Sequence, residues 1–148
     1  MTAWPVQDLV PHSGSMVLID EVLSCTADTL SARTTVRAGG LFNNADGSVP
    51  AWLGLELMAQ GIAAWAGYHA RRDVRPVRLG FLLGTRRYDC HVDHFPAGAE
   101  LRIDIERTLQ DDSGIGVFEC TVSGDGVLAS ARVNVFQPDD TVHYLQEQ

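Results

Sequence analysis

The side chain in this sequence whose type and position most suggest chemistry is Glu56. It is a carboxylate inside a long apolar run, where Gln60 is the other polar interruption before the run turns polar near residue 69. Burying a carboxylate is costly unless it has a partner or a task, so Glu56 is a candidate general acid or base. The alternative is a structural carboxylate that binds loop amides or a buried arginine. Gln60 lies on the same helical face and either orients Glu56 or is satisfied within the core.

A second group of candidates is basic. The chain carries a formal charge of −8, which excludes general nucleic-acid binding, and its eleven basic residues are all arginine. Six of them fall within 17 positions: Arg71, Arg72, Arg75, Arg78, Arg86 and Arg87. Such a cluster on an acidic chain predicts an anionic partner. The alternative is ordinary solvated surface after a helix.

Metal and thiol chemistry find less support in the sequence. Cys25, Cys90 and Cys120 are far apart and form no C-x-x-C pair, so free thiols are expected. His91 and His94 would point to opposite faces of a strand, and no further Cys or His completes a zinc site. We therefore expect no metal and no cofactor.

The elements that must position these groups follow from the patterning. Residues 51–72 predict one long helix, with Pro50 at its first position and Ser48 as its cap. Because it is apolar on nearly every side, we expect it to be buried all round. A short helical turn is expected at 6–12, and strands at 16–23, 30–37, 78–90, 100–109, 115–123 and 127–136. This order predicts an α+β domain over residues 1–138 with a mostly antiparallel sheet, and a polar tail over 139–148.

Location follows from what the sequence lacks. It has no apolar run of the roughly 18–20 residues that a membrane span needs. Residues 1–10 lack the basic region of a signal peptide. We therefore expect a cytoplasmic protein with no membrane partner.

Three stretches of the sequence follow patterns shared with a known protein family. PAWLGLELMAQ, residues 50–60, follows the pattern P-G-x-L-G-L-(D/E)-x-M-x-Q and so resembles the helix of hotdog-fold 3-hydroxyacyl-acyl-carrier-protein dehydratases. LVPH with MVLIDEV, residues 9–22, resembles the opening motif, and FPAGAEL, residues 95–101, resembles the proline–glycine turn. GFLLGTRRY resembles a strand of the small dehydratase-like proteins of aryl polyene clusters. The resemblance implies a long central helix wrapped by a curled antiparallel sheet.

The resemblance also implies roles for single residues. In the family the helix acid, here Glu56, works with a histidine of the partner subunit that lies 14 positions before it; this sequence has Phe42 there. Ala51 stands where a family glycine binds the thioester carbonyl through its amide, or is an ordinary first-turn residue. His12 belongs to the opening motif and is either structural or a substitute base. Asn43 and Asn44 neighbour the missing histidine and either orient water or form a turn.

The resemblance thus predicts a 3-hydroxyacyl-thioester dehydratase acting on acyl chains held by an acyl-carrier protein. Phe81 and the apolar helix would line the tunnel for the chain, and Arg71, Arg72, Arg86 and Arg87 would meet the acidic carrier. The alternatives are a hotdog thioesterase that uses Glu56 with Asn43 or Asn44, and a non-catalytic subunit of a heteromeric dehydratase. The protein is expected to form a homo-oligomer or a heterodimer with a related dehydratase.

Overall fold

The computed structural model describes residues 5–10, 17–37, 43–73 and 81–136. The expected tail, 139–148, lies outside these residues. The elements in chain order are η1 (Val6–Asp8), β1 (Glu21–Cys25), β2 (Thr29–Thr35), β3 (Val49–Pro50), α1 (Leu53–Arg72), β4 (Phe81–Cys90), β5 (His94–Phe95), β6 (Glu100–Gln110), β7 (Ile115–Gly124) and β8 (Val127–Phe136).

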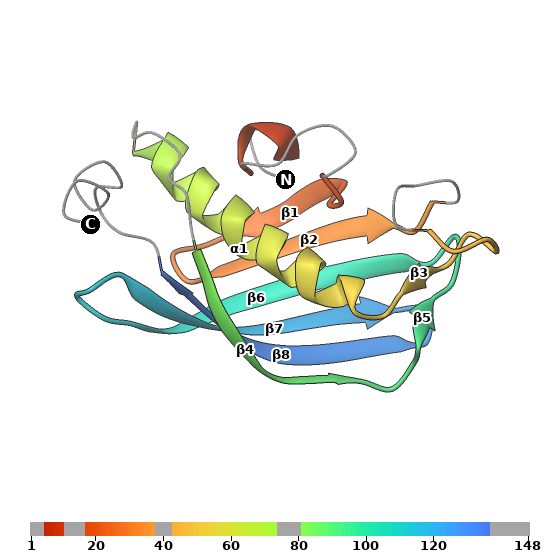
Figure 1. Ribbon diagram of the computed structural model, residues 1–148. Coiled ribbons are helices and arrows are strands. Elements are labelled where there is room, and N and C mark those ends of the chain that lie inside the picture. Colours follow the sequence, from red (N-terminus) through yellow and green to blue (C-terminus); the bar gives the residue numbers. More distant parts are fainter. Residues whose placement is uncertain (1–4, 11–16, 38–42, 74–80, 137–148) are drawn as a thin grey trace.

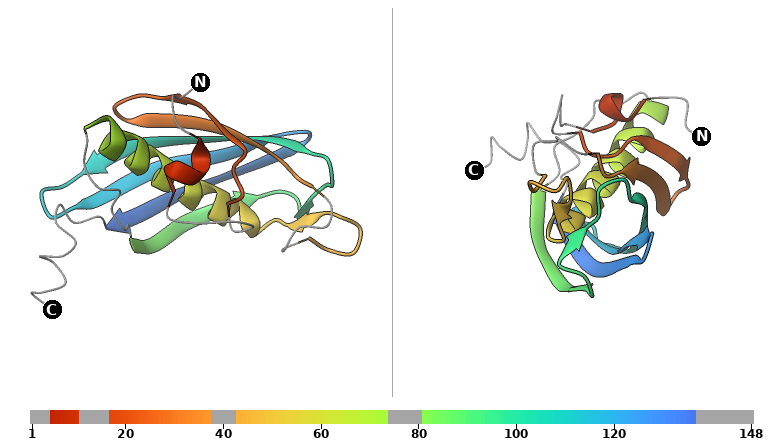
Figure 2. Two further views of the ribbon diagram at one scale, coloured as in Figure 1. Left: turned by 90° about the horizontal axis from the view of Figure 1, so that it is seen from above. Right: turned by 90° about the vertical axis from the view of Figure 1, so that its right-hand side faces the viewer.

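A six-stranded antiparallel sheet forms the body of the molecule. Its strand order is β1-β2-β6-β7-β8-β4, so β1 and β4 are the edges. Buried residues alternate along β6, β7 and β8, because successive strand residues point to opposite faces. The sheet curls around α1 (Figure 1; Figure 2, right). The expected hotdog fold is confirmed.

Small residues let α1 lie close to its neighbours. A Cβ added to Gly61 would lie 3.3 Å from both Ile103 and Ile105 of β6. A Cβ added to Gly67 would lie 1.9 Å from the carbonyl oxygen of Leu9, just after η1. The glycines of the helix therefore serve close packing, although each costs about 1 kcal/mol of helix propensity relative to alanine.

The helix begins later than the sequence predicts. Val49 and Pro50 pair with Phe95 and His94 as the short ladder β3–β5, so Pro50 is extended rather than the first helical residue. The residue before α1 is Trp52, which makes no side-chain cap. Ser48 instead donates its hydroxyl to Asp46 at 2.6 Å. The sequence did not reveal this ladder. It replaces the first helical positions expected at 50–52, because it joins the chain before α1 to the turn before β6.

One side of α1 is only partly covered, against the expectation of burial all round. Trp52 is 56% exposed, and Leu55, Glu56, Ala59 and Ala63 are half-buried. These five residues recur at intervals of three or four and form one stripe, which we call the open stripe. Within the described part of the chain, no helix is long and apolar enough to cross a membrane.

Candidate active site at the start of helix α1

Glu56 lies in the first turn of α1, on the open stripe, and is held by Gln60. The Gln60 side-chain amide donates to Oε1 of Glu56 at 3.2 Å. The other end of that side chain, Oε1, accepts the backbone N–H of Leu18 at 2.9 Å. Because Gln60 is fully buried and the Leu18 N–H fixes which end is the acceptor, its NH₂ group must face Glu56. The sequence left two alternatives open for Gln60, and the structure shows a buried side chain that also contacts the carboxylate.

Ala51, two residues before the first residue of α1, has both its N–H and its carbonyl hydrogen-bonded. Its N–H donates to the carbonyl of Asp93 at 3.0 Å. Its carbonyl accepts the N–H of Gly54 at 3.0 Å and the hydroxyl of Tyr88. In this structure the Ala51 N–H is therefore bound to the Asp93 carbonyl, next to β5, and is not free to bind the carbonyl of a thioester.

Tyr88 reaches the helix start from the sheet edge, and sequence reasoning did not single it out. Burial raises its pKa above the usual range of a phenol. A lone tyrosine in a strand that follows a glycine-containing helix was the available signal. Their contact could not be read from the sequence, since it requires β4 to return alongside the start of α1.

A β-bulge precedes this contact. Between the pairs Arg86–Arg132 and Asp89–Ser130, β4 has two residues where β8 has one. Arg87, the first of the two, has φ +57°, a left-handed conformation that costs a non-glycine residue about 1–2 kcal/mol. Bulges redirect the side chains that follow them, and here Tyr88 points toward the helix.

Asn43 and Asn44 lie in the turn that precedes β3. The side-chain amide of Asn43 donates to the carbonyl of Gly47, and that of Asn44 to Ser48 Oγ at 3.1 Å. The backbone N–H of Asn44 also donates to the Ser48 carbonyl at 2.7 Å. These contacts match the turn interpretation of both residues, and their amides are committed to the loop.

The arginine cluster does not form one surface patch among its described side chains. Arg71 and Arg72 end α1; the Nε of Arg71 donates to the Asp8 carbonyl at 2.9 Å, and Arg72 pairs with Asp73 at 3.1 Å. Arg87 precedes Tyr88, which contacts the other end of the helix. A helix of 20 residues is about 30 Å long, so closeness in sequence did not mean closeness in space.

Some candidates lie outside what the structure describes. His12, Phe42, Arg75 and Arg78 are not among the described residues, and the side chains of Phe81 and Arg86 are not described either. The backbones of Phe81 and Arg86 lie in β4, at the edge of the sheet. Their expected roles in the tunnel and the carrier site remain predictions.

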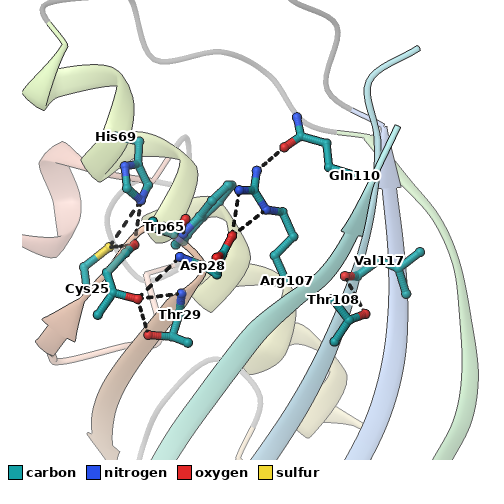
Figure 3. Close-up of polar contacts among 11 residues, drawn as sticks. Cys25, Asp28, Thr29, Trp65, His69, Arg107, Thr108, Gln110 and Val117 are labelled. Atoms are coloured by element: carbon teal, nitrogen blue, oxygen red, sulfur yellow. Dashed lines mark hydrogen bonds and ion pairs between the residues drawn. The ribbon is translucent and has the colours of Figure 1, made fainter. Parts of the chain in front are cut away.

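A separate polar cluster lies toward the other end of α1 (Figure 3). Arg107 pairs with Asp28 at 2.7 Å, and its guanidinium carbon lies 4.8 Å from the ring centre of Trp65. Arg107 and Trp65 line a pocket with Ile62 and Phe118. Trp65 lies nine residues after Glu56, about half a turn around the helix at roughly 100° per residue. This pocket therefore belongs to the sheet-facing side of α1 and not to the open stripe.

Cys25 and Cys120 are poor nucleophiles in this fold, because burial raises the pKa of each thiol. Cys25, 4.0 Å from Nε2 of His69 (Figure 3), has its pKa raised to about 11 by burial. Burial likewise raises the pKa of Cys120 to about 12. All three thiols are free, as expected, and His91 binds the carbonyls of Gly126 and Leu128 rather than Cys90.

Comparison with known proteins decides the family. The family description "ApeP-like: ApeP dehydratase" matches residues 4–146. The chain belongs to the ApeP-like dehydratase family. The resemblance seen in the motifs is confirmed, and the protein is a hotdog dehydratase-like protein. Comparison with curated proteins gives no match.

Solved structures agree with this assignment. A chain of the dehydratase heterocomplex ApeI:P from Xenorhabdus doucetiae is 35% identical, with a TM-score of 0.87 over 98% of this chain and 97% of that one. A hypothetical thioesterase with coenzyme A from Streptococcus pneumoniae TIGR4 is 14% identical, with a TM-score of 0.61 over 79% and 86%. The E. coli PaaI protein is 14% identical, with a TM-score of 0.60 over 78% and 81%. The last two share the fold alone.

Proposed function

We propose that this protein is the acid-bearing subunit of a heteromeric 3-hydroxyacyl-thioester dehydratase in polyene biosynthesis, and that an acyl-carrier protein presents its substrate. Family membership supports the dehydratase class, and the heterocomplex formed by the relative supports the assembly. The assignment of a carrier protein is supported by the motif resemblance and by Arg87, an exposed cation that directly precedes Tyr88 in β4.

The observation that carries the proposal is a carboxylate held ready on an incompletely covered helix. Gln60 orients Glu56, and Glu56 lies on the open stripe, where a partner subunit can reach it. The position of the family histidine is occupied by Phe42. An acid without its own histidine is what a subunit needs when the partner supplies the other half of the site.

The elimination requires two catalytic groups of the protein, a base and an acid, that act on the substrate. A base removes the proton at Cα, the double bond forms between Cα and Cβ, and an acid protonates the hydroxyl at Cβ so that it leaves as water. We assign the acid to Glu56 and the base to a histidine of the partner subunit. The reaction is balanced without an oxidant, reductant or cofactor.

The test is Glu56→Gln in a complex with a related, histidine-containing dehydratase subunit. The amide keeps the shape of the side chain but cannot deliver the proton, so dehydration should fall by about 10²–10⁴-fold. Formation of the enoyl thioester is measured with the 3-hydroxyacyl chain on a carrier protein and, separately, on coenzyme A. Glu106→Gln, an exposed position on the sheet, is the matched control and should keep full activity.

Two results would contradict the proposal. Full turnover by Glu56→Gln would remove this residue from the mechanism, and full turnover by the wild-type chain alone would remove the need for a partner. Release of free thiol in the same assay would favour the thioesterase alternative. That alternative is weakened by the Asn43 and Asn44 amides, which bind their own turn.

A further inference from the structure

The start of α1 is fastened to two different strands. The Ala51 N–H donates to Asp93, next to β5, and the Ala51 carbonyl accepts the Tyr88 hydroxyl from β4. Val49 and Pro50, just before it, pair with β5. The first turn of the helix is thus held by contacts far from it in sequence, although it lacks a side-chain cap.

Gly54 makes room for the tyrosine. A Cβ at Gly54 would lie 2.2 Å from the Tyr88 hydroxyl oxygen and 3.3 Å from Cζ of Phe95. The distance to the hydroxyl oxygen is too short for an unstrained contact. The phenol therefore sits directly against the backbone of the first turn. The Tyr88 hydroxyl donates to the carbonyl of Ala51, and burial, which raises its pKa, favours the protonated form that this bond requires.

Arg87 shows that this placement of Tyr88 is maintained against a local cost. Its left-handed conformation, φ +57°, is unfavourable for a side chain with a Cβ. Strain of this kind persists where the surrounding structure requires it and is frequent near functional sites. Here the bulge turns Tyr88 toward the carbonyl of Ala51.

We propose that Tyr88 is a positioning residue that fixes the first turn of α1 and thereby places Glu56, two residues after Gly54, against the substrate. The proposal rests on the proposed function, because it assumes that Glu56 is the acid. We assign Tyr88 a positioning role because its hydroxyl contacts the backbone at the helix start.

The first test compares Tyr88→Phe with Tyr68→Phe, the same change near the far end of α1, in the complex with the dehydratase partner. Hydrogen exchange of the amides at 53–56 reports the fastening, and kcat and KM report its consequence. Tyr88→Phe should speed exchange at 53–56 and lower kcat about 10- to 100-fold, the scale of a small misplacement, with KM within about twofold. Tyr68→Phe should change none of these values.

The second test uses double variants. Adding Tyr88→Phe to Glu56→Gln should lower the residual rate little further, because the tyrosine acts through the carboxylate. Gly54→Ala should disturb exchange at 53–56 more in the wild type than in the Tyr88→Phe background, where the oxygen that would clash is gone.

Each failure has its own meaning. Unchanged exchange in Tyr88→Phe, or faster exchange with an unchanged kcat, would overturn the positioning role while the wild-type activity leaves the proposed function intact. Multiplying effects of Tyr88→Phe and Glu56→Gln would also overturn it. An inactive wild-type complex would overturn the proposed function and the catalytic consequence together, and exchange would still show whether the fastening exists.

Discussion

At the scale of single residues, the half-buried carboxylate of Glu56 ends a short hydrogen-bond network that runs through the buried side chains of Thr34 and Gln60. The Thr34 hydroxyl donates to the Leu18 carbonyl at 2.5 Å, the Leu18 N–H donates to Gln60, and Gln60 donates to Glu56. Buried polar groups are almost always hydrogen-bonded, and here that requirement links β2 to the candidate acid. Gln60 is the member of the network whose loss affects both stability and the site.

Gln60→Met tests this link, because it keeps the length of the side chain and removes both of its polar ends. It leaves the part-buried N–H of Leu18 without its acceptor, which should lower the free energy of unfolding by about 1–3 kcal/mol. Urea unfolding measures the change. Gln110→Met, at an exposed position, should change stability much less, and equal effects of the two substitutions would contradict the network.

At the scale of elements, the helix and the long strands could be predicted because each buries one face with its own period. The alternation in residues 100–109 and 115–123 marks β6 and β7 to within a residue. β3 and β5 are two residues each, too short for any period, and they move the start of α1 to Leu53. Glu56 and Gln60 could be predicted for the same reason as the helix, as polar breaks in an apolar run. The contact of Tyr88 with Ala51 could not, since it depends on a bulge that places β4 over the helix start.

Because Arg87 lies in a bulge with a left-handed conformation, we expect glycine and valine there to affect stability in the opposite way to an ordinary strand position. Arg87→Gly should leave stability unchanged or raise it by up to about 1 kcal/mol, because relief of the left-handed strain outweighs the added freedom of the unfolded chain. Arg87→Val should destabilise, since a β-branched residue fits φ +57° poorly. Thermal unfolding of both variants measures the changes.

Arg102→Val is the control for that pair. Arg102 is the third residue of β6 and pairs with Arg33 on one side and Ser123 on the other. Its surface ion pair with Asp104 contributes little to stability. Valine suits such a position, so stability should stay within about 0.5 kcal/mol. If valine were tolerated equally well at both positions, the left-handed conformation of Arg87 would be wrong.

At the scale of the whole molecule, one helix inside one curled sheet leaves two kinds of surface incomplete. The open stripe of α1 exposes Trp52 and leaves Leu55 half-buried, and exposed apolar patches mark interaction sites. β1 and β4 end the sheet, and edge strands are open to pairing with another chain. The open stripe also carries Glu56, so a subunit that covers it would complete the site and the hydrophobic interior together.

Ala59→Arg tests whether the open stripe is the contact with the partner subunit. Ala59 is half-buried on the stripe, one turn after Leu55, and a small side chain there allows another helix or strand to come close. The helix propensity of arginine is close to that of alanine, so the isolated chain should keep its melting temperature. In the assembly the bulky charge would be buried without a partner, so the complex should dissociate at micromolar concentration, as measured by its mass in solution, and dehydration should fall with it.

Ala97→Arg, in the exposed turn before β6, makes the same change off the stripe and should leave the complex and its activity intact. A complex that keeps its mass with Ala59→Arg would place the partner elsewhere, at the β1 or β4 edge alone.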